Sequence, residues 1–154
     1  MSALEPPMGE LAEGEHRFPV RVYYEDTDAG GIVYHAAYLR LAERARTEFL
    51  RVLGWPHQRL RHETGFFWAV RRVEIDYVQP ARLDDALVVA TRLVELRGAS
   101  MVARQVIRRG AADLARLTLS LVLLTEAGRP ARLPPALRGV FLPFVPVYES
   151  APRP

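Results

Sequence analysis

The amino-acid sequence predicts an α+β domain in which a curved antiparallel sheet wraps around one long helix. Two patterns support this fold class: one long amphipathic segment at 36–53, and a later series of strand-like segments separated by short turns. Short turns join antiparallel neighbours, and the order of elements is not the alternating order of a parallel sheet. A single helix buries its apolar stripe only when the sheet curls around it. The length of 154 residues fits one domain with its own core.

The residue patterns divide the chain into three parts: a flexible tail at 1–16, a folded domain at 17–128 and a proline-rich extension at 129–154. The domain begins with a half-buried strand at 18–24, and a short helix is expected after the long one, at 57–63. Further strands, the first with a bulge near Arg71, are expected at 66–78, 87–96, 101–109 and 114–125. We expect the extension to be a surface tail with one helical turn at 136–140.

The segment 36–53 has the clearest helical pattern in the chain. Gly54 and Pro56 follow it and are typical helix-ending residues. Its charged face contains two pairs at helical spacing, Arg44 with Glu48 and Glu43 with Arg46, which we expect to be solvated ion pairs. Its apolar stripe consists of Tyr38, Leu41, Ala42, Ala45, Phe49, Val52 and Leu53.

The composition excludes several kinds of site. The chain has no cysteine, which rules out disulfides, thiolate metal ligands and a cysteine nucleophile. Its four histidines form no recognised ligand motif; His57 and His62 are five positions apart on the expected short helix. We therefore expect neither a metal nor a cofactor.

Charge and hydropathy limit the partners. The net charge is +3, but the 21 basic residues are all arginines scattered among 18 acidic residues, so no nucleic-acid surface is expected. No apolar run approaches the roughly 20 residues that a membrane helix needs. The acidic N-terminal segment is unlike a secretory signal, and we expect a cytoplasmic protein without a membrane span.

The loop between the first strand and the long helix is the candidate site. Gly30 and Gly31 permit positive φ and close approach of a ligand, and the start of a helix has N–H groups without intrahelical partners. Asp28 precedes them, so a carboxylate can face a carbon whose oxygen is held by helix amides. Such a layout suits acyl transfer or hydrolysis. A turn or N-cap role explains the same residue types, and those types alone leave both interpretations open.

Several blocks of residues resemble a known family. The loop and helix sequence Tyr23-Tyr24-Glu25-Asp26-Thr27-Asp28-Ala29-Gly30-Gly31-Ile32-Val33-Tyr34-His35, with Tyr38 and Glu43-Arg44-Ala45-Arg46-Thr47-Glu48, is similar to the signature of hotdog-fold acyl-CoA thioesterases of the 4-hydroxybenzoyl-CoA thioesterase superfamily. The resemblance is to its Tol-Pal-associated, YbgC-like branch. Tyr77 with Pro80-Ala81-Arg82-Leu83-Asp84-Asp85, and Arg97-Gly98-Ala99-Ser100, extend it over most of the chain.

The resemblance implies a hotdog fold and assigns roles to residues of the loop. Asp28 corresponds to the catalytic carboxylate, and the backbone N–H of His35 to the amide that polarises the thioester carbonyl, with the His35 side chain also in the site. Relatives often have His-x-Asn-Tyr at the helix start, whereas this chain has Ala37 in place of the Asn. Asp26 is expected to support the turn. The residues expected to contact substrate are Gly30, Gly31, Tyr34, Arg97 and Ser100.

Other assignments follow from the same resemblance. A homodimer or homotetramer is implied, and Arg71, Arg72 and Arg97 are candidates for contacting the nucleotide of coenzyme A. We expect Tyr38, Phe49 and Trp68 to lie in the core rather than in an acyl pocket. The sequence does not distinguish Asp28 as a nucleophile from Asp28 as a general base. The alternative function is a non-catalytic module that binds acyl-CoA or an acyl-carrier protein.

Overall fold

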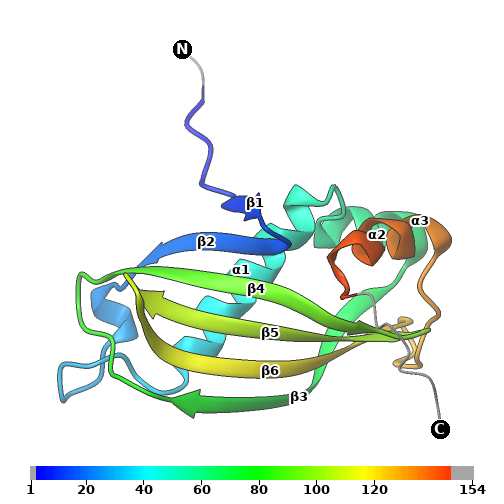
Figure 1. The fold of residues 1–154 in the computed structure, drawn as a ribbon. Helices are drawn as coiled ribbons and strands as arrows, with labels where there is room; N and C mark the ends of the chain where they lie inside the picture. Colours follow the sequence, from blue (N-terminus) through cyan, green and yellow to red (C-terminus); the bar gives the residue numbers. More distant parts are fainter. Residues whose placement is uncertain (1–2, 147–154) are drawn as a thin grey trace, which may run out of the picture.

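A computed structural model describes residues 3–146, and its elements form one sheet with one long helix (Figure 1). In chain order the elements are β1 (Glu10–Ala12), β2 (Glu15–Arg21), a 3₁₀ turn (Tyr24–Asp26), α1 (Ala37–Val52), α2 (His57–Thr64), β3 (Phe67–Tyr77), β4 (Ala86–Leu96), β5 (Ser100–Arg109), β6 (Ala112–Leu124), α3 (Pro135–Phe141) and a second 3₁₀ turn (Leu142–Phe144).

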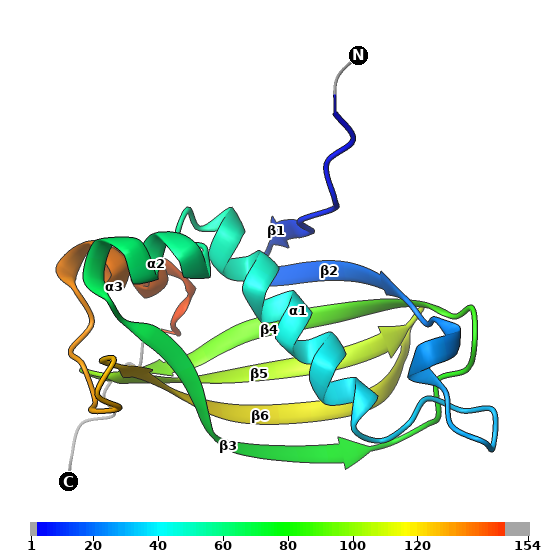
Figure 2. The same cartoon turned by 180° about the vertical axis from the view of Figure 1, so that it is seen from behind.

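The sheet has six antiparallel strands in the order β1-β2-β4-β5-β6-β3. Figure 2 shows α1 lying across the concave face of this sheet, with α2 and α3 gathered at one end. The predicted α+β hotdog fold is therefore confirmed. The predicted bulge is also present, since the register of β3 against β6 shifts between Val70 and Arg72.

Helix α1 is the centre of the core. The helix begins and ends within one residue of the predicted bounds, and Gly54 follows it with a φ of +82°. The apolar stripe packs against β2, β4, β5 and β6, whose inward side chains include Leu117 and Leu119. The buried residues of the helix are Ala37, Tyr38, Leu41, Ala42, Ala45, Phe49 and Leu50.

The structure corrects the expected N-terminal boundary. Strand β1 and the start of β2 lie inside the segment expected to be a flexible tail, and both Glu15 and His16 are buried. The expected strand at 18–24 ends earlier, at Arg21. The cause is local, because the Asp26 carboxylate accepts the N–H of Tyr23 at 2.8 Å and closes a turn there.

The C-terminal extension is also more ordered than expected. The predicted helical turn is confirmed as α3, but this segment is not a surface tail, because Leu137 and Phe141 are fully buried. They join a second cluster with Phe49, Trp55 and Leu60 at the α2 end of the molecule. The remainder of the expected extension, 147–154, lies outside the described residues.

The two expected ion pairs on α1 are wrong. Within residues 3–146, neither Arg44 with Glu48 nor Glu43 with Arg46 comes within 4 Å, and Glu48 pairs instead with Arg51 at 3.1 Å. The Arg46 side chain turns toward the sheet, where its Nη1 donates to Gln105 Oε1 at 3.0 Å.

None of the helices in the described part of the chain is long and apolar enough to cross a bilayer.

Candidate active site

The loop that carries Asp28 is a tight hairpin. Thr27 and Val33 form an isolated antiparallel bridge, and the Asp28 N–H donates to the Ile32 carbonyl at 2.8 Å. Gly31 donates its N–H to the Asp28 carbonyl at 3.1 Å and has a φ of +81°, which a glycine adopts without strain. The backbone therefore fixes the position of Asp28 between β2 and α1.

The Asp28 carboxylate is oriented by main-chain amides and stays accessible. Its Oδ1 accepts the N–H of Gly30 at 2.8 Å and that of Ile32 at 3.4 Å. A Cβ atom at position 30 would lie only 3.2 Å from Asp28 Oδ1, so a glycine there suits this geometry. The residue is exposed and lines a surface groove. A carboxylate held this way can act on a ligand in the groove.

The first turn of α1 presents free amide groups. Its N-cap residue, Ala36, has no side chain able to accept a hydrogen bond, and no side-chain cap is formed. Within residues 3–146, the N–H groups of His35 and Ala36 donate to no main-chain carbonyl, whereas the Ala37 N–H donates to the Tyr34 carbonyl at 2.8 Å. These groups are available for an oxygen of a bound ligand.

Two tyrosines hold the helix start against the end of β3. The Tyr77 hydroxyl donates to the His35 carbonyl at 2.7 Å, and the Tyr38 hydroxyl accepts the N–H of Ala81 at 3.0 Å. Their rings meet edge to face with centroids 5.4 Å apart. Burial raises the pKa of Tyr77, which keeps its hydroxyl protonated and able to donate.

Asp28 and His35 share one groove of about 360 Å³. The structure thus brings together the two residues expected to be catalytic. The opposite wall comes from the end of β3 and the segment after it, a contribution that the sequence interpretation missed. Tyr77 and Pro80 belong to the sequence blocks that resemble the thioesterase family, and this resemblance could have indicated that they line the site. The groove is lined by Asp28, Ile32, Val33, His35, Tyr38, Tyr77, Val78, Gln79 and Pro80.

The other expected substrate contacts are only partly brought together. Gly31 lines a second hollow of about 460 Å³ on the other side of Asp28, and the Tyr34 ring lies 4.4 Å from the His35 ring. Gly30 orients Asp28 through its N–H. Arg97 and Ser100 lie at the turn between β4 and β5, at the opposite end of the sheet from the loop that joins β2 to α1 (Figure 1).

The remaining acidic residues near the loop have structural roles. Asp26 is buried, and its carbonyl accepts the Tyr34 N–H at 2.8 Å, which is the supporting role expected for it. Asp85 accepts the Arg82 N–H and pairs with Arg109 at 2.7 Å; both contacts lower the pKa of Asp85. No group of three or more histidine, aspartate and glutamate side chains in residues 3–146 is placed to hold a metal ion.

Comparison with known proteins identifies the family. Residues 22–141 match the profile of the thioesterase-like superfamily. The acyl-CoA thioesterase YbgC of Haemophilus influenzae is 44% identical over 126 residues, which cover 80% of this chain and 92% of that protein. The acyl-CoA thioester hydrolase YbgC of Escherichia coli O6:H1 is 53% identical over 89 residues, 58% of this chain and 66% of that protein.

Solved structures agree with this assignment. A probable thioesterase from Bartonella henselae superposes with a TM-score of 0.76 at 40% identity, covering 78% of this chain and 99% of that one. A thioesterase from Thermus thermophilus, complexed with coenzyme A and Zn, has a TM-score of 0.70 at 31% identity, covering 81% and 90%. The resemblance seen in the sequence is thus confirmed, and the chain belongs to the thioesterase-like superfamily as a hotdog-fold thioester hydrolase of the YbgC type.

Proposed function

We propose that the chain hydrolyses acyl-CoA thioesters to a free carboxylic acid and coenzyme A, with Asp28 as the working carboxylate. The observation that carries the proposal is the shared groove: Asp28 and His35 both line it, and the His35 N–H donates to no main-chain carbonyl in residues 3–146. In this proposal the His35 N–H binds the thioester carbonyl oxygen, whose negative charge grows as the carbon is attacked. Tyr77 positions that amide through the His35 carbonyl.

Two routes through Asp28 lead to the same products. As a general base, Asp28 takes a proton from water while the water oxygen bonds to the carbonyl carbon. The C–S bond then breaks, and the departing thiolate takes up that proton. As a nucleophile, an Asp28 oxygen displaces the thiolate and forms a mixed anhydride. Water cleaves the anhydride, giving the acid and a proton for the thiolate.

Coenzyme A as the acyl carrier is supported by the relatives. The proteins from Haemophilus influenzae and Escherichia coli are named as acyl-CoA thioesterase and acyl-CoA thioester hydrolase, and the Thermus thermophilus structure is a complex with coenzyme A. Because acyl-CoA thioesters are made and consumed inside the cell, the proposal places the protein in the cytoplasm.

The test replaces Asp28 by asparagine, which keeps the shape of the side chain and removes its charge. Release of free thiol from short, long and aromatic acyl-CoAs is measured for wild type and for Asp28→Asn. We expect kcat/KM to fall by about 100-fold or more, since a positioned acid or base contributes at least that factor. The matched control is Glu25→Gln, an exposed carboxyl in the preceding turn, which is expected to keep wild-type kcat/KM.

Two outcomes contradict the proposal. If wild type binds acyl-CoA but releases no thiol from any of the substrates, the chain is the non-catalytic binding module instead. If Asp28→Asn retains wild-type kcat/KM, another residue supplies the carboxylate. The thermal midpoint of each variant shows that it is folded.

A further inference from the structure

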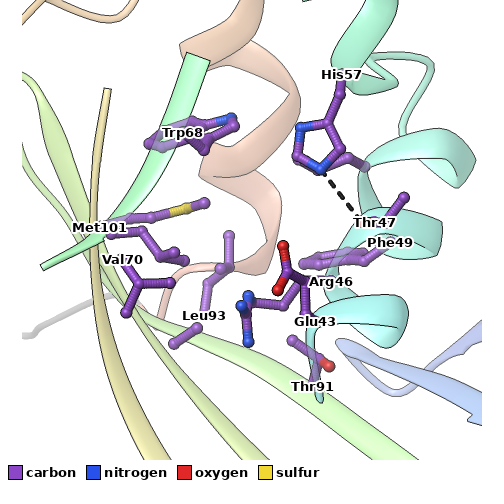
Figure 3. A pocket seen from close by; sticks show the side chains of 13 residues that line it. Glu43, Arg46, Thr47, Phe49, His57, Trp68, Val70, Thr91, Leu93 and Met101 are labelled. Atoms are coloured by element: carbon purple, nitrogen blue, oxygen red, sulfur yellow. Dashed lines mark hydrogen bonds between the residues drawn. The ribbon is translucent and has the colours of Figure 1, made fainter. Parts of the chain in front are cut away.

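A cavity separate from the groove and the hollow beside Asp28 lies between α1, α2 and the sheet, further along α1 (Figure 3). Its volume is about 50 Å³, and it shares no lining residue with the groove. Water needs about 10–15 Å³ of such space per molecule, so the cavity has room for a few waters or one small group. It is a separate compartment within the same subunit.

One wall of this cavity carries the Arg46 guanidinium, whose hydrogen bond is to an amide oxygen and not to a carboxylate. Arg46 donates to Gln105 Oε1, and within residues 3–146 no carboxylate oxygen lies within 4 Å of its guanidinium. Gln105 is itself fully buried and donates to the Ala42 carbonyl and to Thr91 Oγ1. A guanidinium has several further N–H donors, and a desolvated cation is costly unless an acceptor compensates it. Burial also lowers the pKa of Arg46, although the charge of Glu43 opposes the shift.

A second donor in the same cavity is unused. Trp68 lines the cavity, and its Nε1 is buried with no acceptor among the described residues. A buried N–H without a partner is uncommon in folded proteins, and a water molecule or a ligand oxygen can supply the acceptor. Figure 3 shows Trp68 and Arg46 around the same space, with Leu93 and Met101 between them.

The other lining groups define the mouth. Thr47 Oγ1 and His57 Nε2 are 3.1 Å apart, and burial lowers the pKa of His57, which favours the neutral imidazole. Glu43 also lines the cavity; it is exposed, and its negative charge acts on Arg46 and on His57. The interior therefore combines unused donors with apolar walls, and the mouth carries the only acidic side chain of the lining.

We propose that this cavity binds a small monocarboxylate, whose oxygens accept from the Arg46 guanidinium while its short apolar body packs against Leu93 and Met101, toward Trp68 on the opposite wall. A carboxylate has two oxygens and matches a guanidinium in geometry and charge. The site goes beyond the proposed hydrolysis, because it does not use Asp28 or the groove.

The two tryptophans of the chain provide the readout. The indole N–H signals in a ¹⁵N-correlated NMR spectrum are followed while butyrate or isovalerate is added, and butyramide serves as the uncharged match. We expect the Trp68 signal to shift saturably with the acids and not with the amide. Trp55 is buried beneath the Arg59 guanidinium and does not line the cavity, so its signal is the internal control. Trp55→Phe assigns the two signals.

Variants of α1 separate this site from its surroundings. Arg46→Met is expected to weaken binding by about tenfold or more through loss of a charge-assisted contact, whereas Arg44→Met on the exposed face keeps wild-type affinity. Glu43→Gln is expected to tighten binding by removing a like charge. Arg46→Lys retains the charge and should bind more tightly than Arg46→Met, which keeps the test informative if the methionine variant is less stable.

The proposal is overturned if the Trp68 signal does not shift with either acid, if butyramide shifts it equally, or if Arg46→Met binds as wild type does. Asp28→Asn is expected to bind the carboxylate with unchanged affinity. Loss of binding in that variant would place the carboxylate in the groove and would overturn the cavity assignment. Thiol release by wild type is measured independently of carboxylate binding, so a result that overturns the cavity site leaves the proposed hydrolysis standing.

Discussion

Tyr77 is the residue through which the sheet positions the proposed oxyanion amide. Its hydroxyl donates to the His35 carbonyl, and the N–H of His35 faces no main-chain acceptor in residues 3–146. Tyr77→Phe removes this hydrogen bond and leaves the ring packing in place. A net hydrogen bond contributes about 0.5–1.5 kcal/mol, so we expect kcat to fall by about 2–10-fold with little change in KM.

The control for Tyr77 is Tyr24→Phe, because Tyr24 is 83% exposed and lies outside the groove. Steady-state thiol release at varied acyl-CoA concentration separates kcat from KM. A rise in KM alone would show that Tyr77 contacts the ground-state substrate and does not position the amide. An unchanged kcat and KM would remove Tyr77 from the site.

Among single residues, the sequence predicted those of the loop between β2 and α1, but it did not predict the residues that contact them from other elements. The pattern of an acidic loop before a helix pointed to Asp28 with a capping role still open, the family resemblance added His35, and both residues line one groove in the structure. Arg46 was assigned to a solvated pair because helical spacing places it near Glu43. Whether it turns outward or inward depends on Gln105, which is 59 residues away in the chain.

Long elements were predictable and short ones were not. Helix α1 and the four strands after it have enough residues for their periodicity to show, and each was predicted close to its observed bounds. Strand β1 has three residues and no periodicity, so its pairing with β2 was hidden. Helix α3 follows Pro134 in a proline-rich segment, and its burial depends on packing against residues distant in sequence, such as Phe49 and Leu60.

The first two strands contain a buried histidine that links folding to pH. His16 is fully buried, its Nε2 lies 2.7 Å from the Met8 carbonyl oxygen, and its ring stacks on Phe49. Burial lowers the pKa of His16, although the Met8 carbonyl and the charge of Glu48 oppose the shift. The unfolded chain therefore binds a proton at higher pH than the folded chain does.

The sign of this linkage gives a prediction. His16 contributes stability that is present above its unfolded pKa of about 6.5 and is lost as pH falls through the lowered folded pKa. We expect the free energy of unfolding, from urea titrations between about pH 7.5 and 5, to fall less steeply in His16→Phe than in wild type. The control His62→Gln, at an exposed position, keeps the wild-type slope. An equal slope in His16→Phe would contradict the assignment.

The two edge strands of the sheet, β1 and β3, differ in length. Strand β1 is short, but β3 is an edge of 11 residues and is paired only with β6 among the described residues. Its inward residues Val70, Val73 and Tyr77 remain partly exposed, although the Tyr77 ring contacts Tyr38 of α1. A long apolar edge favours pairing with another strand. The family resemblance implies a homodimer or homotetramer, and we infer that two copies pair through β3.

Antiparallel pairing of two β3 strands about a two-fold axis has a consequence for the site. The Tyr77 end of one copy then lies beside the Trp68 end of the other, so each Asp28 groove borders the second subunit.

The prediction uses two valines with similar exposure: Val73 on β3 is 36% exposed and Val88 on the interior strand β4 is 37% exposed. We expect wild type and Val88→Asp to sediment as dimers or larger assemblies, and Val73→Asp to sediment as a monomer with reduced kcat/KM. The cost of aspartate depends on the strand and on the face, so the thermal midpoint of each variant is measured beside its sedimentation, and a folded Val73→Asp monomer reports the interface. Wild type that sediments as a fully active monomer would contradict the pairing.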